Sequence, residues 1–469
     1  MFVDELHLTL ECMDCKLFLG VLICKLINQI VSMKKLVTVL SLILLVVGLG
    51  SCSKDQKQPS IAPTKLSLTP TEIILKVGES KQLKASVEPK GNTPTVIFAS
   101  DNQEVATVDA NGLVKAVAEG TANITAKVGE LVEQCAVTVS NFTPASTKGA
   151  SVVLTTDTKP GEKISLIIKV ASDSPHDVWI DINGNNRYDL GEEVTVYDKA
   201  QSYTVGEATT ISIYGNLTTL WCDKNKLSAL DVSNNPTLRE LWCHKNKLTE
   251  LVLTNNKDLR ELNCFSNQLS KLDLSENLKL TKLFCYKNQL TSLDISRNHL
   301  LTELECYSNS IQELQLSSLV NLTKLWCGEN QLTSLDISKC TKLADLSCYS
   351  NQLSSLDLSQ HSQLKQLDCG DNQLISLDVS KNPLISWLRC DVNRLQGEYM
   401  SRFIQSLHDR SGQESGYIYI INKDADAGEH NVCTKSQVAI ATSKNWKVFD
   451  SDDEPYPGSN ETSSSSCKL

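Results

Sequence analysis

The sequence has few of the residues that enzymes use for chemistry and none of the motifs in which such residues are usually arranged. Its seven histidines are scattered over 469 residues, and we find no H-E-x-x-H sequence, nucleophile elbow, phosphate-binding loop or catalytic pair of carboxylates. Aromatic residues make up only 5% of the chain. A formal net charge of −10 is ordinary for a soluble protein and does not favour an anionic partner. The sequence therefore predicts neither an enzyme nor a nucleic-acid-binding protein.

Long apolar runs are also scarce, and the run near the N-terminus is too short for a permanent membrane-spanning helix. It extends from Leu36 to Leu49, follows the basic start Met33-Lys-Lys, and leads into Gly-Ser-Cys52. This order of a basic segment, a short apolar run and small residues before a cysteine resembles a bacterial lipoprotein signal. The resemblance implies cleavage before Cys52 and attachment of lipid to the Cys52 thiol.

The resemblance also divides the N-terminal part of the chain. We predict that 1–32 is a mis-annotated extension before a true start at Met33, that 33–51 is the signal peptide, and that 52–61 is a tether. The segment Ser53-Lys-Asp-Gln resembles a lipoprotein export signal. It implies a lipid anchor in the outer membrane and exposure at the cell surface.

Nine cysteines recur at a spacing of 21 residues, each within the frame L-x-x-L-x-C-x-x-N-x-L. They are Cys222, Cys243, Cys264, Cys285, Cys306, Cys327, Cys348, Cys369 and Cys390. A fixed period of this length indicates a solenoid, in which each coil contacts only its neighbours. Counted from the first leucine of the frame, positions 1, 4, 6, 11, 14 and 16 are apolar in nearly every copy. We predict that these side chains point inward and stack on the next coil.

Two positions of the frame need a specific explanation. Position 9 is Asn in all nine copies, from Asn225 to Asn393, and we expect it to satisfy backbone groups of neighbouring coils. The cysteines at position 6 could form disulfides or bind metal, because successive coils lie about 4.8 Å apart. Their parallel Cβ vectors suit neither disulfide geometry nor a tetrahedral metal site. We therefore predict a ladder of reduced, buried cysteines.

The second half of each repeat reads L-D-[LVI]-S-x-N, as in 293–298. Because 21 residues leave no room for a full helix, we expect a flattened coil with strand on both sides. The frame over 217–397 resembles the cysteine-type leucine-rich repeats of internalin-like bacterial surface proteins, although the late Asn is lost at Leu319 and Cys340. The resemblance implies a curved right-handed solenoid with the L-x-C strand on its concave face, and a role in adhesion or host binding.

Aromatic residues gather beside the inward positions of the predicted strand, at positions 3, 5 and 7. They are Trp221, Trp242, Phe265, Phe284, Tyr286, Tyr307, Trp326, Tyr349 and Trp387. Solvent-facing rings on consecutive coils are typical of binding surfaces, so these residues are candidate ligand contacts. The alternative is that the rings only stack on one another. Charged neighbours alternate in sign, which again argues against nucleic acid.

The other side of the coil carries aspartates at position 15. They are Asp231, Asp273, Asp294, Asp336, Asp357 and Asp378. A cation-binding stripe is one interpretation. We expect instead a solvated acidic edge in which each Asp bonds to its own turn.

Residues 62–140 read as short strands separated by turns. The stretches Val77-Gly78-Glu-Ser, Phe98-Ala-Ser-Asp and Asn111-Gly112-Leu-Val resemble the bacterial Ig-like domain, group 2. The resemblance implies a small β-sandwich that acts as a spacer, with direct adhesion as the alternative.

Residues 148–215 form a second predicted β-rich domain, with an acidic loop as its main feature. The loop matches the ligand positions 1, 3, 5, 7, 9 and 12 of an EF-hand-like pattern, of which position 7 supplies a backbone carbonyl oxygen. These positions hold Asp181, Asn183, Asn185, Arg187, Asp189 and Glu192. At position 6, Asn186 replaces the usual glycine, and Asn tolerates the left-handed conformation. Calcium is the candidate ligand, the alternative is a plain polar turn, and no other cofactor is expected.

Beyond 397 the period stops, and 398–450 reads as helix, strand, helix and strand. We predict a small α/β cap over the apolar end of the solenoid, followed by a disordered acidic and Ser-rich tail at 451–469. The expected fold is therefore mainly β: a leucine-rich-repeat solenoid preceded by an Ig-like β-sandwich and a second small β-rich domain.

These features predict a non-enzymatic, monomeric surface lipoprotein. Its ligand would be a host glycoprotein, a glycan or another cell surface, bound through the concave face as in an adhesin. The alternative from a different class is a ligand-capture component of an outer-membrane nutrient-uptake system. A third interpretation is a scaffold whose rings bind nothing.

Overall fold

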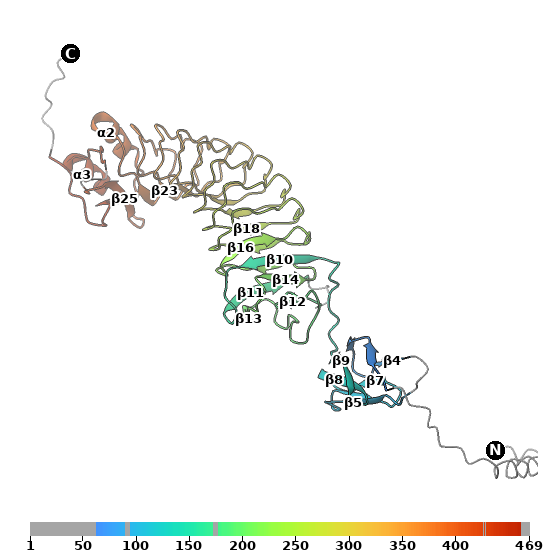
Figure 1. The fold of residues 1–469 in the computed structure, drawn as a ribbon. Helices are drawn as coiled ribbons and strands as arrows, with labels where there is room; N and C mark the ends of the chain where they lie inside the picture. The colour runs from blue at the N-terminus through green and yellow to red at the C-terminus, as the bar shows by residue number, and fades with distance from the viewer. Residues whose placement is uncertain (1–61, 90–93, 172–176, 425, 427, 461–469) are drawn as a thin grey trace, which may run out of the picture. The chain divides into compact units, whose positions relative to one another are not determined.

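The computed structural model describes residues 62–89, 94–171, 177–424, 426 and 428–460 (Figure 1). Cys52 and the predicted segments 1–32, 33–51 and 52–61 lie outside these ranges. Among the described helices, none has the length and apolar character of a membrane span. The described residues are mainly in strands, turns and loops, which confirms the predicted fold class.

The described part of the predicted Ig-like domain contains only short strands and turns. The strands are β1 (Lys65–Thr69), β2 (Glu72–Leu75), β3 (Ser80–Gln82), β4 (Lys84–Glu88), β5 (Ile97–Ser100), β6 (Ala106–Val108), β7 (Leu113–Ala116), β8 (Gly120–Val128) and β9 (Leu131–Val139). They pair as β1-β4, β2-β9-β8-β5 and β3-β7-β6. Along β8 the side chains alternate between buried and exposed, with Ile124 and Ala126 fully buried, as expected for a strand with one face on a core.

The second β-rich unit shares its core with the repeats. Its strands are β10 (Ser151–Thr156), β11 (Lys163–Lys169), β12 (Trp179–Asp181), β13 (Gln201–Thr204) and β14 (Thr210–Tyr214). One sheet runs β12-β14-β10-β16, where β16 (Leu227–Asp231) belongs to the first repeat, while β13 and β11 begin the long sheet of the solenoid. Buried Val152 and Leu154 are in the same hydrophobic cluster as the repeat leucines. The unit thus covers the apolar first coil of the solenoid.

The solenoid is built on one three-residue strand per repeat. These strands are β15 (Thr219–Trp221), β17 (Glu240–Trp242), β18 (Glu261–Asn263), β19 (Lys282–Phe284), β20 (Glu303–Glu305), β21 (Lys324–Trp326), β22 (Asp345–Ser347), β23 (Gln366–Asp368) and β24 (Trp387–Arg389). They pair in parallel and in register, so that Leu220 faces Leu241 and Leu241 faces Leu262. Figure 1 shows the coils stacked between the labels β16 and β23.

The expectation of strand on both sides of the coil was wrong. In the described residues, only the first repeat has a strand in its second half, β16, which pairs with β10. In later repeats this half consists of turns and irregular backbone. The first repeat differs because its second half has an antiparallel partner, β10. The Asx turn formed by a position-15 aspartate and the Ser two residues later occurs both in this repeat, at Asp231, and in repeats without the strand, as at Asp294.

The predicted cysteine ladder is confirmed. All nine repeat cysteines are free and fully buried, and they stack between the leucines of positions 1, 4 and 11. Burial raises the pKa of each thiol, to about 12 for Cys264 and Cys306. A thiol in such surroundings stays protonated and unreactive, so the cysteines serve as small apolar core residues.

The asparagines at position 9 join neighbouring coils as predicted. The Asn246 Nδ2 donates to the carbonyl oxygens of Cys222 at 3.1 Å and Cys243 at 2.9 Å. Its Oδ1 accepts from the backbone N–H of Leu227 at 3.0 Å. Each side chain therefore satisfies backbone groups of two coils that have no strand partner.

A second ladder lies at position 19, at the end of the repeat. The Asn277 Nδ2 donates to the carbonyl oxygens of Leu253 at 3.0 Å and Asn256 at 2.9 Å. In the seventh repeat His361 replaces this asparagine and takes over part of its role, since a ring nitrogen of His361 lies 3.0 Å from the Ile337 carbonyl oxygen.

The C-terminal cap continues the sheet of the solenoid. It consists of α2 (Gly397–Ser406), β25 (Gly416–Ile421), α3 (Lys435–Ser443) and β26 (Trp446–Asp450), and β25 and β26 extend the parallel sheet beyond β24. Thr434 and Gln437 form a capping box at the start of α3. The tail is ordered further than predicted, because the Tyr456 hydroxyl and the Ser459 N–H both donate to the Cys433 carbonyl oxygen. Residues 451–460 therefore belong to the cap.

Candidate functional site

The solvent-facing side of the sheet from β15 to β24, formed by positions 3, 5 and 7 of each repeat, is called here the strand face. All nine aromatic residues predicted to face solvent lie on it, and each is partly buried rather than fully exposed. They lie there because the leucine at position 4 and the cysteine at position 6 point inward, so the residues between and beside them point outward.

In the first five repeats the rings stack directly on one another. The Trp221 and Trp242 rings are parallel within 4°, with centroids 3.9 Å apart. A second column runs along position 7, from His244 through Phe265 and Tyr286 to Tyr307, with centroid separations of 4.3, 4.2 and 4.2 Å. This half of the strand face fits the stacking alternative, since neighbouring rings cover each other's faces.

From the sixth repeat onward the column is interrupted. Position 7 holds Gly328, so Tyr307 meets Trp326 instead, in a tilted arrangement with centroids 6.3 Å apart. The Tyr349 ring lies over Gly328, where an added Cβ would be only 2.4 Å from the ring. The Tyr349 hydroxyl donates to Glu329 Oε1 at 2.8 Å, which holds the ring over the preceding coil. The ring is thereby displaced from the column that it would otherwise continue.

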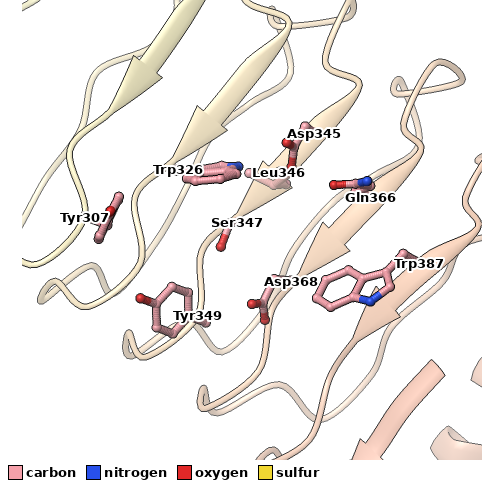
Figure 2. A pocket seen from close by; sticks show the side chains of 9 residues that line it. All are labelled: Tyr307, Trp326, Asp345, Leu346, Ser347, Tyr349, Gln366, Asp368 and Trp387. Atoms are coloured by element: carbon pink, nitrogen blue, oxygen red, sulfur yellow. The ribbon is translucent and has the colours of Figure 1, made fainter. Parts of the chain in front are cut away.

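The interruption leaves a cavity of about 410 Å³ (Figure 2). Its aromatic lining comes from Tyr307, Trp326, Tyr349 and Trp387, and its polar lining from Asp345, Ser347, Gln366 and Asp368, beside Leu346. Figure 2 shows Ser347 between the rings of Trp326 and Tyr349, and Asp368 between Tyr349 and Trp387. The structure thus brings four of the nine predicted contact residues together, one of which, Tyr307, also ends the stacked column. Of the other five, Phe284 stacks on no ring in the described part of the chain, and the rest stack on their neighbours.

The charge inside the cavity is negative. Burial raises the pKa of Asp368 to about 6; a hydrogen bond from the Gly370 N–H and the Arg389 charge oppose this rise, while Asp391 and Asp345 add to it. Arg389 itself is engaged by Asp391, through contacts of 2.8 and 3.0 Å. Within the described part of the chain, neither Asp345 nor Asp368 forms a salt bridge.

A lysine at the rim of the cavity is also engaged. The Lys324 Nζ lies 3.6 Å from the centre of the Trp326 ring and 2.7 Å from Glu305 Oε1. The Lys324 cation therefore already has a carboxylate partner in Glu305, and it lies on the face of Trp326, a ring that also lines the cavity. Among the described residues, Asp345 and Asp368 are left without a salt-bridge partner.

Sequence reasoning did not single out Gly328, Gly370 or Asp368. Gly370 occupies position 7 two repeats after Gly328, and a Cβ there would lie 2.9 Å from Asp391 Oδ1. The signal that could have found them is the order Gly, Tyr, Gly at position 7 in the sixth to eighth repeats. Position 7 holds a ring in each repeat from His244 to Tyr349 except at Gly328, so this glycine indicates a break in the column.

The acidic loop adopts the turn that its pattern predicts. Asp181 is buried, and its carboxylate accepts backbone N–H bonds from Gly184, Asn185 and Asn186 at 2.7 to 3.0 Å. Asn186 has a φ of 59°, the left-handed conformation expected at position 6. The loop therefore closes around the Asp181 carboxylate.

The remaining predicted ligands of the loop converge from its other side. The side-chain amides of Asn183 and Asn185 both donate to Asp189 Oδ2 at 2.7 Å. Buried Glu192 accepts from the N–H groups of Ile182 and Asp189, and desolvation together with the Asp189 and Asp181 charges raises its pKa to about 7. Among the described residues, no three His, Cys, Asp or Glu side chains are arranged as a metal site. Any calcium bound here would need the amide oxygens of Asn183 and Asn185, and the Arg187 carbonyl oxygen.

The position-15 aspartates form the solvated edge that was expected. Each accepts a bond from the N–H of the serine two residues later, at distances from 2.8 to 3.0 Å. The position-15 aspartates therefore bond within the turns in which they lie.

Three solved structures are similar to parts of the chain. The functional domain of InlJ from Listeria monocytogenes, which includes a cysteine ladder, is 29% identical, with a TM-score of 0.42, over 54% of this chain and 64% of that one. YopM from Yersinia enterocolitica is 24% identical, with a TM-score of 0.32, over 44% and 46%. The leucine-rich-repeat ectodomain of a plant receptor kinase from Arabidopsis thaliana is 21% identical, with a TM-score of 0.37, over 47% and 27%. The matched part of each of these three chains is less than two thirds of its length.

No curated protein matches the chain significantly. Residues 62–139 match the bacterial Ig-like domain (group 2). For the repeats, the fold follows from the in-register strands, the buried cysteines and the asparagine ladders described above. The chain therefore combines a bacterial Ig-like domain of group 2 with a leucine-rich-repeat solenoid that contains a cysteine ladder.

Proposed function

We propose that this protein is a non-enzymatic lipoprotein of the bacterial cell surface that binds a macromolecule through the strand face. The observation that carries the proposal is the row of partly exposed rings that runs along most coils and leads to an aromatic-lined cavity. A continuous exposed aromatic surface is a common mark of an interaction site. The ligand is a host glycoprotein, a glycan or another cell surface, and the role is adhesion.

A binding screen tests the proposal. The chain from residue 53 onward would be presented to arrays of glycans and of extracellular proteins. We expect a ligand whose binding survives deletion of the Ig-like domain and is lost when rings of the strand face are removed. Binding by the Ig-like domain alone would contradict the proposal.

The anchor is a separate part of the proposal and has its own test. Lipid attachment at Cys52 predicts that Cys52→Ala abolishes labelling with a radioactive or clickable fatty acid and releases the protein from membranes. Ser51→Ala is the matched control, since a small residue is retained before the cysteine. Membrane retention of the Cys52→Ala protein would contradict the lipoprotein assignment.

We also propose that the acidic loop binds calcium as a structural ion. Support comes from the closed turn around Asp181 and from the buried carboxylate of Glu192, whose pKa is raised by burial and, to a smaller extent, by the nearby Asp189 and Asp181 charges. Asp189 would contribute its carboxylate, and the amides of Asn183 and Asn185 would turn their oxygens inward.

A further inference from the structure

We infer that the cavity on the strand face receives the cationic side chain of a lysine or arginine on a protein partner, with the cation held between aromatic rings and the carboxylates of Asp345 and Asp368. The inference rests on the proposed function, because it names the chemistry by which the strand face selects its ligand. It also reduces the candidate ligands to proteins that present an exposed basic residue.

The shape of the cavity is the first argument. Rings from four different repeats surround a floor made by Ser347 (Figure 2). The Tyr349 ring takes its place at the edge of this space because Gly328 has no side chain and the ring can lie over it. The cavity volume of about 410 Å³ lies within the range of about 300–1,000 Å³ seen for small-ligand sites. One extended side chain with part of its backbone fits such a space, whereas a folded domain does not.

The charge is the second argument. Two carboxylates, Asp345 and Asp368, line a space whose other walls are mostly aromatic. The basic residues nearest to them already have partners, since Arg389 pairs with Asp391 and Lys324 pairs with Glu305. A carboxylate partly removed from water is stabilised by an incoming cation, and an anionic ligand would be repelled.

The aromatic rings are the third argument. The faces of tryptophan and tyrosine rings attract ammonium and guanidinium groups, and cages of such rings are a recurring way to bind them. The protein already makes one such contact, because the Lys324 ammonium lies 3.6 Å from the centre of the Trp326 ring. A neutral sugar could also stack on these rings, but it would bring no charge to the partly buried Asp368 carboxylate, which has no salt-bridge partner among the described residues. The combination of rings and carboxylates therefore favours a cation over a sugar.

The proposed site has a predictable dependence on pH. Asp368 is faced by Asp345 on β22, by Tyr349 in the loop after β22, and by Arg389 and Asp391 at the end of β24. Burial raises the Asp368 pKa to about 6, so this carboxylate is charged at pH 7.5 and largely protonated at pH 5. A cation should therefore bind more weakly at pH 5 than at pH 7.5. A neutral ligand should not show this dependence unless it needs the same ionised oxygen.

The test uses the chain from residue 53 onward and the pentapeptides Gly-Gly-Lys-Gly-Gly and Gly-Gly-Arg-Gly-Gly, with norleucine at the central position as the uncharged control. Binding is followed by quenching of tryptophan fluorescence and by calorimetry. We expect the basic peptides to bind at least about tenfold more tightly than the norleucine peptide, and Asp368→Asn to remove most of this difference. Asp378→Asn in the same repeat is the matched control, because its carboxylate lies outside the cavity and accepts a hydrogen bond from the Ser380 N–H.

A second variant keeps the test independent of the charge. Ser347→Leu fills the floor of the cavity and should abolish binding of both basic peptides, while circular dichroism and thermal unfolding confirm that the coil is intact. Equal binding of the norleucine peptide, unchanged lysine binding by Asp368→Asn, or displacement of the peptides by neutral monosaccharides would overturn the inference. If a macromolecular ligand from the binding screen needs the strand face but binds Ser347→Leu normally, the proposed function stands and this inference fails.

Discussion

The two halves of the strand face are built on one 21-residue frame, yet they present different surfaces. From Trp221 to Tyr307 the rings stack on their neighbours and the surface is filled. From Trp326 to Trp387 the column is broken, and the rings surround a cavity. The backbone is the same in both halves, because the inward apolar residues, the position-6 cysteines and the position-9 asparagines are retained. The difference arises at positions 5 and 7, which are free of core packing.

The difference between the two halves indicates which repeat positions carry information about function. Uniform positions such as the cysteine at position 6 satisfy the core, and their regularity carries no information about a ligand. A departure such as Gly328 in a column of rings costs stacking and has no benefit for the core. Such a departure is therefore the better indicator of a binding site.

The largest expected effect is a difference in binding between the two halves. Replacing Trp326 and Trp387 by Ala should weaken binding of a strand-face ligand by about 2 kcal/mol or more for each ring, the usual cost of truncating an interface anchor. Replacing Trp221 and Trp242 by Ala should lower stability and leave binding nearly unchanged. Calorimetric titration of both double variants with the same ligand makes the measurement. The reverse pattern would place the contact surface on the filled half.

The next effect concerns the N-terminal end of the solenoid, next to the filled half. The folded Glu192 has a pKa of about 7 against 4.5 for an ordinary glutamate, so without calcium the folded state holds a proton that the unfolded state has released. Stability should therefore be highest below pH 4.5 as far as this group is concerned, and fall by about 3 kcal/mol as the pH rises through 7. Glu192→Gln should remove this dependence.

Calcium should offset the same loss of stability at pH 8. Wild type with calcium should unfold at a higher temperature than wild type with chelator, and Asp181→Ala should abolish the difference. Hydrogen exchange should show added protection in the β-rich unit and first repeats, with no change around the cavity. Equal unfolding temperatures with calcium and with chelator would refute calcium binding.

The frame of the molecule could be predicted from the sequence because packing dictates it. The residue at position 6 must be small and apolar because it lies inside the coil, and the residue at position 9 must bond to backbone groups that have no strand partner. The 21-residue period therefore sufficed to predict that Cys306 is buried and that Asn246 joins neighbouring coils. The cap was predictable for a similar reason, since the last coil needs an apolar cover. The prediction of strand in the second half of each repeat held only for the first repeat, where β10 supplies a pairing partner that the repeat pattern does not show.

The cavity could not be predicted, because it depends on the lack of a side chain at Gly328 and on the Tyr349 ring, which lies outside the column of rings at position 7. Gly328 reads in the sequence as a tolerated small residue, and only the position of the Tyr349 ring over it shows why the column ends. The Asp368 carboxylate likewise reads as one more exposed acid. Its burial follows from Tyr349 and Trp387 on either side, which lie 19 residues before and after it in the sequence.

A smaller effect should be the same in both halves. Cys306→Ser and Cys369→Ser each place a hydroxyl in a fully buried site, and each should lower the free energy of unfolding by about 1–3 kcal/mol. In the wild type, thiol reagents should react with ladder cysteines only on unfolding. Rapid labelling of Cys369 but not Cys306 in the native protein would show that the cavity half is loosely packed, and that the halves differ in core as well as in surface.

The smallest effect isolates stacking itself. Tyr286→Leu retains apolar area but removes the two ring contacts, to Phe265 and Tyr307, and should lower the free energy of unfolding by about 1 kcal/mol. Tyr349→Leu is the matched change in the other half, where the ring stacks on no neighbour in the described part of the chain and its hydroxyl bonds to exposed Glu329. It should change stability by less than about 0.5 kcal/mol, the usual range for a surface substitution, while weakening peptide binding. Equal losses of stability from both variants, measured by urea unfolding, would mean that Tyr349 is a packing residue and that the break in the column is not devoted to a ligand.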